Sequence, residues 1–272
     1  MYEWIFATLI VFLASVLQAA TGFGFAIMAT PFLLLVFDSR DCIQISIILS
    51  FFISIVLAPK IRHEIDYVLL KRLILGSISG VLAGLLFFAY VSLAVLKIMV
   101  SVVILTATLF LLARGYLRGF KSSGHASDDL PGETELPAID GSTKSFIRSL
   151  KDPATLGDLL VGLCAGTLTT SIGMPGVPLA LYFNARNTKK EVIRSTTLAF
   201  FVAVYVVSIA LQIITVKIRL SVLISSLVLI PAAAVGVLLG NLLFYKINQK
   251  MFQLAAYIIL LYTGFYMLIK AI

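Results

Sequence analysis

Long apolar stretches alternate with short polar ones along almost the whole chain. In order, the apolar stretches occupy positions 4–20, 26–37, 42–58, 67–90, 93–113, 156–170, 176–184, 195–215, 220–245 and 251–271. Several reach about 20 residues, the length that crosses a bilayer as a helix. Helices pair their backbone groups internally, as lipid requires, and the chain lacks the alternating pattern of barrel strands. The pattern predicts an all-α polytopic membrane protein with 8–10 membrane segments.

The order of these stretches repeats in the two halves of the chain. Each half opens with a stretch that glycines interrupt, and longer stretches follow. The glycines at 80 and 84 recur 156 residues later, at 236 and 240. Small residues at this spacing form helix-packing faces in membranes, and internal repeats are common in transporters. We therefore expect a two-repeat membrane protein.

The polar interval between the halves defines the expected domain boundaries. Residues 115–154 are rich in Gly, Ser, Asp, Glu, Pro and Lys, a composition typical of solvated, disordered segments. We expect an N-terminal transmembrane repeat at 1–114 and a C-terminal one at 155–272. The linker between them would be a plain connector rather than a regulatory segment, with a short interfacial helix around 145–150.

Positive charge distinguishes two possible topologies. If each broken stretch crosses the membrane once, the halves are parallel and the Lys and Arg residues divide 13 to 8 between the two sides. If each broken stretch is a hairpin, the halves are inverted and the division is 16 to 5. The positive-inside rule favours the more asymmetric arrangement. We expect inverted repeats, each a broken helical hairpin followed by three transmembrane helices, with a cytoplasmic linker and both termini outside.

Composition supports a membrane protein and excludes several other classes. The chain is 60% hydrophobic and 12% charged, with mean hydropathy +1.07, whereas soluble proteins are about a quarter charged. The net charge of +8 reflects basic loops without interleaved aromatics, so no nucleic-acid partner is expected. Two cysteines without a CxxC pair and two loop histidines predict no metal, no cofactor and no enzyme. Homo-oligomerisation stays open.

The two breaks are the best candidates for a binding site. Each frees backbone groups that lipid cannot satisfy, so it must face protein or a watery cavity. The helix that begins at each break directs its N-terminal N–H groups and partial positive charge toward it. Two such ends, related by a pseudo-twofold axis, would converge near the middle of the membrane. They would form an anion site without a buried Lys or Arg, and no Lys or Arg falls deep inside a predicted stretch.

Residue types at the breaks suit this role. Glycine lets the backbone approach a ligand closely, hydroxyls donate hydrogen bonds to an oxyanion, and bulky apolar residues wall the site. The alternative to a binding site is that the glycines and prolines only kink the helices so that they pack. The predicted substrate-binding residues are Thr21, Gly22, Phe23, Gly24, Phe25, Thr170, Ser171, Gly173, Met174 and Gly176, with Gln44 and Thr196 from the following stretches. Asp38, Asp41 and Glu191 lie only at the ends of stretches, so a membrane-embedded proton carrier is not expected.

Three segments resemble the sulfite exporter TauE/SafE family of anion permeases: Ala20 to Pro31 (A-T-G-F-G-F-A-I-M-A-T-P), Ser171 to Pro178 (S-I-G-M-P-G-V-P) and Arg194 to Ala199 (R-S-T-T-L-A). The resemblance covers the chain apart from the linker. It implies transport of sulfite, sulfoacetate or a related organosulfur or organic anion across the inner (plasma) membrane. Bulky Phe23, Phe25 and Met174 depart from a fully glycine-rich break, which makes the substrate the least transferable feature.

Four classes of function remain to be weighed. A secondary transporter that uses alternating access around a site between the two hairpins accounts for the repeated breaks. An anion or small-solute channel can share the architecture but needs a continuous pore lined by polar rings. A membrane-embedded enzyme lacks a catalytic constellation, and a non-transporting assembly subunit leaves the breaks unexplained. We expect the transporter, with a small anion and the lipid bilayer as its partners.

Overall fold

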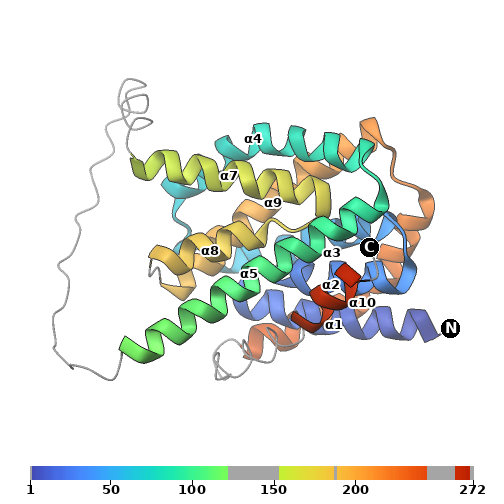
Figure 1. Ribbon diagram of the computed structural model, residues 1–272, viewed down its shortest axis with the longest axis horizontal. Helices are drawn as coiled ribbons and strands as arrows, with labels where there is room; N and C mark the ends of the chain where they lie inside the picture. Colours follow the sequence, from blue (N-terminus) through green and yellow to red (C-terminus); the bar gives the residue numbers. More distant parts are fainter. Residues whose placement is uncertain (1, 122–152, 187–188, 244–260, 270–272) are drawn as a thin grey trace.

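Helices make up all the regular secondary structure in the part of the chain that the computed structural model describes, residues 2–121, 153–186, 189–243 and 261–269 (Figure 1). The named helices are α1 (Tyr2–Thr21), α2 (Phe25–Phe37), α3 (Asp41–Leu57), the short 3-10 helix η1 (Ala58–Glu64), α4 (Tyr67–Tyr90), α5 (Leu93–Lys121), α7 (Pro153–Ile172), α8 (Gly176–Arg186), α9 (Lys190–Thr215) and α10 (Leu220–Leu243). Residues 261–269 form a further helix. The predicted interfacial helix at 145–150 and much of the last apolar stretch lie outside the described residues.

Seven of the described helical stretches are long and apolar enough to cross a membrane. The helix Phe25–Phe37 is apolar but shorter, and α8 has 11 residues. Large hydrophobic side chains stay exposed on the outer faces, for example Leu82 on α4 and Leu238 on α10. This confirms the predicted all-α polytopic membrane protein. Two helices extend beyond the predicted stretches by five residues or more at one end: α5 continues to Lys121, and α9 begins at Lys190 rather than at 195.

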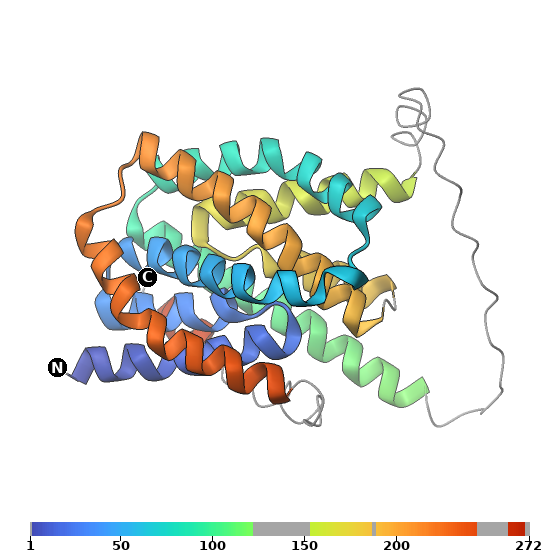
Figure 2. The ribbon, with the colours of Figure 1, turned by 180° about the vertical axis from the view of Figure 1, so that it is seen from behind.

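Helices of one half pack along helices of the other. α4 lies beside α7, and α10 lies beside α1 (Figures 1 and 2). Glycines allow the backbones to touch: a Cβ on Gly166 of α7 would lie 2.5 Å from the Ser77 carbonyl oxygen, and one on Gly240 of α10 would lie 2.5 Å from that of Val16. A Cβ on Gly80 would overlap the Leu163 carbonyl group. The predicted small-residue faces are therefore used for contacts within the chain.

In both halves the second helix returns beside the first. The Trp4 and Phe37 rings, near the start of α1 and at the end of α2, are 5.3 Å apart. In the second half, Asp158 near the start of α7 contacts Tyr182 and Arg186 at the end of α8. Each break therefore reverses the direction of the chain.

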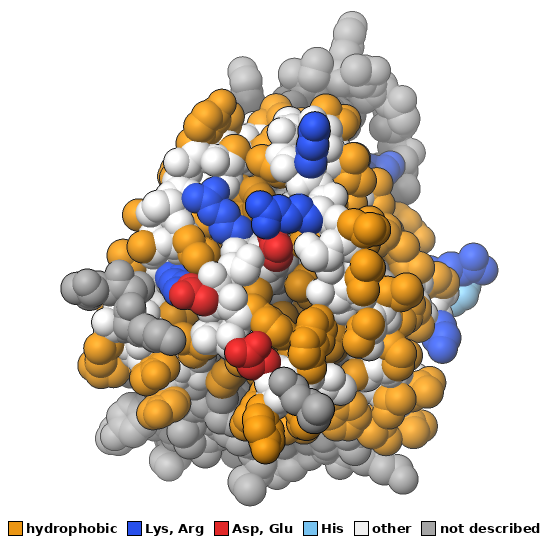
Figure 3. Space-filling model, turned by 90° about the vertical axis from the view of Figure 1, so that its right-hand side faces the viewer, with side chains coloured by type: hydrophobic (Ala, Val, Ile, Leu, Met, Phe, Trp, Pro, Cys, Tyr) orange, Lys and Arg blue, Asp and Glu red, His pale blue; other side chains and the backbone are white. Residues whose placement is uncertain are grey.

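Polar contacts at one end of the bundle join the turns between helices. Arg40, before α3, donates to the carbonyl oxygens of Phe88 and Val91 at the end of α4 (3.2 and 2.6 Å), and Lys97 of α5 pairs with Asp38. Figure 3 looks onto the right-hand end of Figure 1, where charged side chains gather centrally and hydrophobic ones cover the flanks. That distribution suits an end that faces water and flanks that face lipid.

The turn after η1 meets the start of α9. The Ser195 hydroxyl donates to the carbonyl oxygen of Glu64 (2.7 Å), and the Asp66 backbone N–H donates to the Thr196 hydroxyl (3.1 Å). The carboxylate of Asp66 in turn accepts from the N–H groups of Val68 and Leu69 (3.1 and 3.0 Å) and caps α4. The start of α4 is thus tied to the second half of the chain.

Candidate functional site

The first break is a three-residue reversal held by backbone contacts. Gly22 has φ +85° and donates its N–H to the carbonyl oxygen of Gln18 (2.7 Å), which ends α1. The Thr21 hydroxyl donates to the Leu17 carbonyl oxygen (2.7 Å). Gly24, with φ +123°, precedes α2, and no side chain caps the start of that helix. The first N–H groups of a helix have no partner within it, so those of α2 are available at the break.

The second break follows the same plan. Gly173 has φ +75° and donates to the Thr169 carbonyl oxygen (2.9 Å), while the Met174 N–H donates to that of Leu168 (2.9 Å). α8 begins three residues later, at Gly176. Positive φ is the conformation that glycine tolerates and most other residues do not. Glycine at 22 and at 173 is therefore required by the backbone itself.

The two breaks meet in the interior of the protein. A Cβ on Gly176 would lie 3.1 Å from the Cβ of Phe23 and 3.4 Å from Cζ of Phe201 on α9. The start of α8 therefore lies against the first break. The far end of α2 lies near the Lys97–Asp38 pair and the far end of α8 near Asp158, so these two helices lead away from the meeting point to different parts of the protein.

Each break also touches the third helix of the opposite half. A Cβ on Gly22 would lie 2.7 Å from Cα of Arg194 on α9, and one on Gly173 would lie 3.5 Å from the carbonyl oxygen of Ile43 on α3. Gly173 follows Gly22 by 151 residues, and Arg194 follows Ile43 by the same interval. Positions 151 residues apart in the two halves of the chain thus make corresponding contacts.

Buried polar side chains gather on the helices around the breaks. Two glutamines reach between helices: Gln18 donates to the Ser54 hydroxyl (3.1 Å), and Gln212 donates to the Thr170 carbonyl oxygen (3.3 Å). Other side-chain oxygens have no hydrogen-bond partner among the described residues, namely those of Thr30, Ser46, Thr170, Thr197 and Ser208 and the amide oxygens of Gln18 and Gln212. Buried polar atoms normally have partners, so this concentration suits a polar ligand.

The predicted site residues fall into three groups. Phe23 and Gly176 touch, and Gly22, Gly24 and Gly173 shape the reversals. Phe25 and Met174 are buried apolar residues, and Gln44 is also buried. The remaining four carry hydroxyls, and three of these have partners: that of Thr21 donates to the Leu17 carbonyl oxygen, that of Ser171 donates to the Thr167 carbonyl oxygen (2.6 Å), and that of Thr196 accepts from the Asp66 N–H. Thr170 is the one predicted hydroxyl whose oxygen has no partner among the described residues.

Comparison with known proteins identifies the family. The family model described as sulfite exporter TauE/SafE matches residues 7–267. The chain belongs to the TauE/SafE family. This confirms the resemblance in the sequence and makes the protein a multi-pass membrane transporter rather than an enzyme. No curated protein and no solved structure matches the chain.

Among the described residues, no group of three or more His, Cys, Asp or Glu side chains could hold a metal ion.

The burial of one charged residue in this TauE/SafE transporter was not predicted. No Lys or Arg was expected deep inside a predicted stretch, and Arg194 lies near the start of α9, but it is only 3% exposed. Its Nη2 donates to Oδ1 of Asn241 on α10 (2.8 Å). The hydropathy pattern placed the helix start one residue after Arg194 and so treated it as part of a loop. Three small buried residues directly after it, Ser195 to Thr197, were the available signal.

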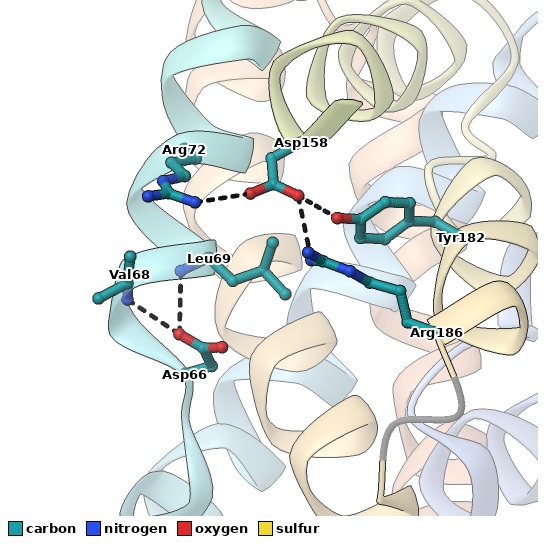
Figure 4. A network of polar contacts seen from close by, with 7 residues as sticks. All are labelled: Asp66, Val68, Leu69, Arg72, Asp158, Tyr182 and Arg186. Carbon is teal, nitrogen blue, oxygen red and sulfur yellow. Dashed lines mark hydrogen bonds and ion pairs between the residues drawn. The ribbon is translucent and has the colours of Figure 1, made fainter. Parts of the chain in front are cut away.

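A buried charged cluster around Asp158 was also not predicted, because we singled out only Asp38, Asp41 and Glu191 among the carboxylates. Asp158 of α7 is 1% exposed, and Figure 4 shows it between α4 and α8. It accepts from Arg72 of α4 and Arg186 of α8, both at 3.2 Å, and from the Tyr182 hydroxyl. Two cations and a hydroxyl satisfy a buried carboxylate that would otherwise be costly. The cluster fixes the end of α8 to α4 and α7.

Proposed function

We propose that this transporter moves a small anion by alternating access around a central site where its two hairpins meet. Sulfite, sulfoacetate or another organosulfur or organic anion is the proposed substrate. The observation that carries the proposal is the contact between the start of α8 and the first break, at Gly176 and Phe23. The contact brings together the beginnings of two short helices from opposite halves of the chain.

The chemistry of these helix starts supports an anion as the ligand. The N-terminus of a helix presents N–H donors and partial positive charge, and both bind anions. α2 has no side-chain cap at Gly24, so its first donors are not occupied by a side chain. The Thr170 hydroxyl, buried at the end of α7 beside the second break, is a further proposed donor.

Equivalent contacts in the two halves support inverted repeats, the architecture that alternating access uses. α4 packs on α7 as α10 packs on α1, and Gly22 contacts Arg194 as Gly173 contacts Ile43. In Figure 1, α1 runs leftward from the N-terminus whereas α7 runs rightward from the grey segment that precedes it. On this basis each repeat is a hairpin followed by three transmembrane helices, and rocking of one repeat against the other would switch access.

The proposed orientation places the linker in the cytoplasm and both termini outside, in the plasma membrane. The contacts that link η1, α4 and α9 join two segments that are rich in positive charge. Residues 60–72 and 186–194 contribute 8 Lys and Arg residues between them. The positive-inside rule assigns such an end to the cytoplasm.

Radiolabelled sulfite uptake into proteoliposomes tests the proposal. A carrier exchanges one substrate molecule for another, so unlabelled sulfite inside the vesicles should accelerate uptake of labelled sulfite. Sulfoacetate, sulfate, taurine, acetate and chloride, tested as internal substrates at equal ionic strength, would define the selectivity. Uptake that runs down its gradient without acceleration by internal substrate would indicate a channel. Absence of flux for every anion would contradict anion transport.

A further inference from the structure

Two buried glutamines bridge the first and third helices in the two halves of the chain. Gln18, in the last turn of α1, donates from Nε2 to the Ser54 hydroxyl of α3 (3.1 Å). Gln212 of α9 donates from Nε2 to the carbonyl oxygen of Thr170 (3.3 Å), which lies in the last turn of α7. Both glutamines are fully buried. An amide group therefore lies at the helical turn that precedes each break.

The partners fix the orientation of both amides. The carbonyl oxygen of Thr170 can only accept, so the part of the Gln212 amide that faces it must be the NH2 group. The Ser54 hydroxyl donates to the Ser50 carbonyl oxygen (2.7 Å), so its oxygen is left to accept from the NH2 group of Gln18. The amide oxygens of Gln18 and Gln212 remain, and neither has a hydrogen-bond partner among the described residues.

The two halves obtain these amides from different positions in the chain. Position 169, which is 151 residues after Gln18, holds threonine, and the Thr169 hydroxyl donates to the Ala165 carbonyl oxygen of its own helix (2.6 Å). The amide beside the second break comes instead from Gln212 of α9. Glutamine is seldom buried, and an unpaired buried acceptor costs about 1–3 kcal/mol. One such acceptor beside each break indicates a ligand that carries a hydrogen-bond donor.

Acceptors and donors select different atoms of a ligand. An amide oxygen has only lone pairs to offer, so it repels the oxygens of a fully ionised anion and binds an O–H or N–H group. Donors for the negative group are available beside the same breaks. They are the first N–H groups of α2, where no side chain caps the helix, and the buried Thr170 hydroxyl, whose oxygen has no partner among the residues described.

We propose that the site selects anions that carry a hydrogen-bond donor of their own, which binds the amide oxygen of Gln18 or Gln212. This inference rests on the proposed function. Hydrogen sulfite and hydroxy- or amino-substituted sulfonates belong to this class. Their negative group binds at the helix starts, and their O–H or N–H group binds an amide oxygen. A fully ionised anion without a donor, such as sulfate, leaves the acceptors unpaired and binds more weakly.

Two sulfonates of nearly the same size test this selectivity. Isethionate carries a terminal O–H group where propanesulfonate carries a methyl group. Both are titrated at constant ionic strength against the full-length protein in detergent, and each affinity is obtained from the rise in the unfolding midpoint. Wild type should bind isethionate at least about fivefold more tightly than propanesulfonate, the contribution of one hydrogen bond.

Methionine variants separate recognition of the ligand from support of the fold. Gln18→Met and Gln212→Met keep the length of the side chain but remove the amide oxygen. The preference for isethionate should disappear in the double variant, and the two single variants show which oxygen binds. A purely structural role would weaken both ligands equally and leave the ratio of their affinities unchanged. The control Thr215→Val, at an exposed hydroxyl of α9 that donates to the Leu211 carbonyl oxygen (2.7 Å), should keep the wild-type ratio.

Equal affinity of wild type for the two sulfonates would overturn the proposal. A preference that persists in the double variant would also overturn it, and if that variant does not fold, persistence in both single variants decides. If neither sulfonate binds, unchanged sulfite affinity in these variants refutes the role of the amide oxygens. Normal sulfite binding with equal sulfonate affinities refutes the selectivity alone. Absence of binding by sulfite and by both sulfonates in wild type refutes the proposed function as well.

Discussion

Replacing Gly166 by alanine tests the direct backbone contact between α4 and α7. The new Cβ would lie 2.5 Å from the Ser77 carbonyl oxygen and 3.0 Å from the backbone nitrogen of Val81. A carbon normally stays about 3.3 Å or more from a carbonyl oxygen. Both neighbouring atoms belong to the backbone of α4, so neither can rotate away and the helices must separate. Overpacking of this kind costs about 1–3 kcal/mol.

Gly157 on the same helix provides a matched control, because a Cβ there meets nothing within 4 Å. Alanine gains about 1 kcal/mol over glycine in a helix at either position, so the difference between the two variants isolates the contact. A difference of about 2 kcal/mol corresponds to roughly 4–8 °C in the unfolding midpoint. The assay is the monodisperse fraction of detergent-purified protein that survives heating, measured by size-exclusion chromatography. Equal midpoints for Gly166→Ala and Gly157→Ala would refute the close approach of α4 and α7.

Two further substitutions separate structural from functional polar groups. Asp158→Asn removes the anionic partner that Arg72 and Arg186 share. Both arginines are partly exposed, so the free energy of unfolding should fall by about 3 kcal/mol or less. In the control Asp41→Asn, where the carboxylate is 4.0 Å from exposed Arg219, it should change by less than about 0.5 kcal/mol, and equal effects of the two variants would count against the buried network. Thr196→Val removes the acceptor of the Asp66 N–H and should lower the free energy of unfolding by about 1 kcal/mol. Its sulfite affinity should stay normal, and a large loss of affinity would place Thr196 in the binding site.

Hydropathy and glycine spacing were sufficient to predict the helices and the two breaks. The reason is physical: lipid enforces apolar stretches of fixed length, and positive φ at positions 22 and 173 requires glycine. Pairing between halves was not predictable in the same way. Gly80 and Gly236 indicate that α4 and α10 each have a packing face. They do not indicate that the face of α4 meets α7 and that the face of α10 meets α1.

Charged and hydroxyl side chains were the least predictable part of the site. Arg194 and Asp158 lie near helix starts, where a sequence pattern cannot distinguish a solvated end from a buried one. Their burial depends on partners far away in sequence, Gly22 and Asn241 for the first and Arg72 for the second. Thr196 and Thr170 are both small hydroxyl residues of buried helices, yet only the former has its oxygen bonded to a backbone N–H.

We propose that an anion binds where α8 begins against the first break. The most direct test is equilibrium binding of radiolabelled sulfite to the purified protein, to Gly176→Val and to Gly157→Val. Position 176 already has Phe23 at 3.1 Å from an added Cβ, whereas position 157 has open space. We expect equal binding by wild type and Gly157→Val, and none by a folded Gly176→Val. Equal sulfite affinity in all three proteins would contradict it.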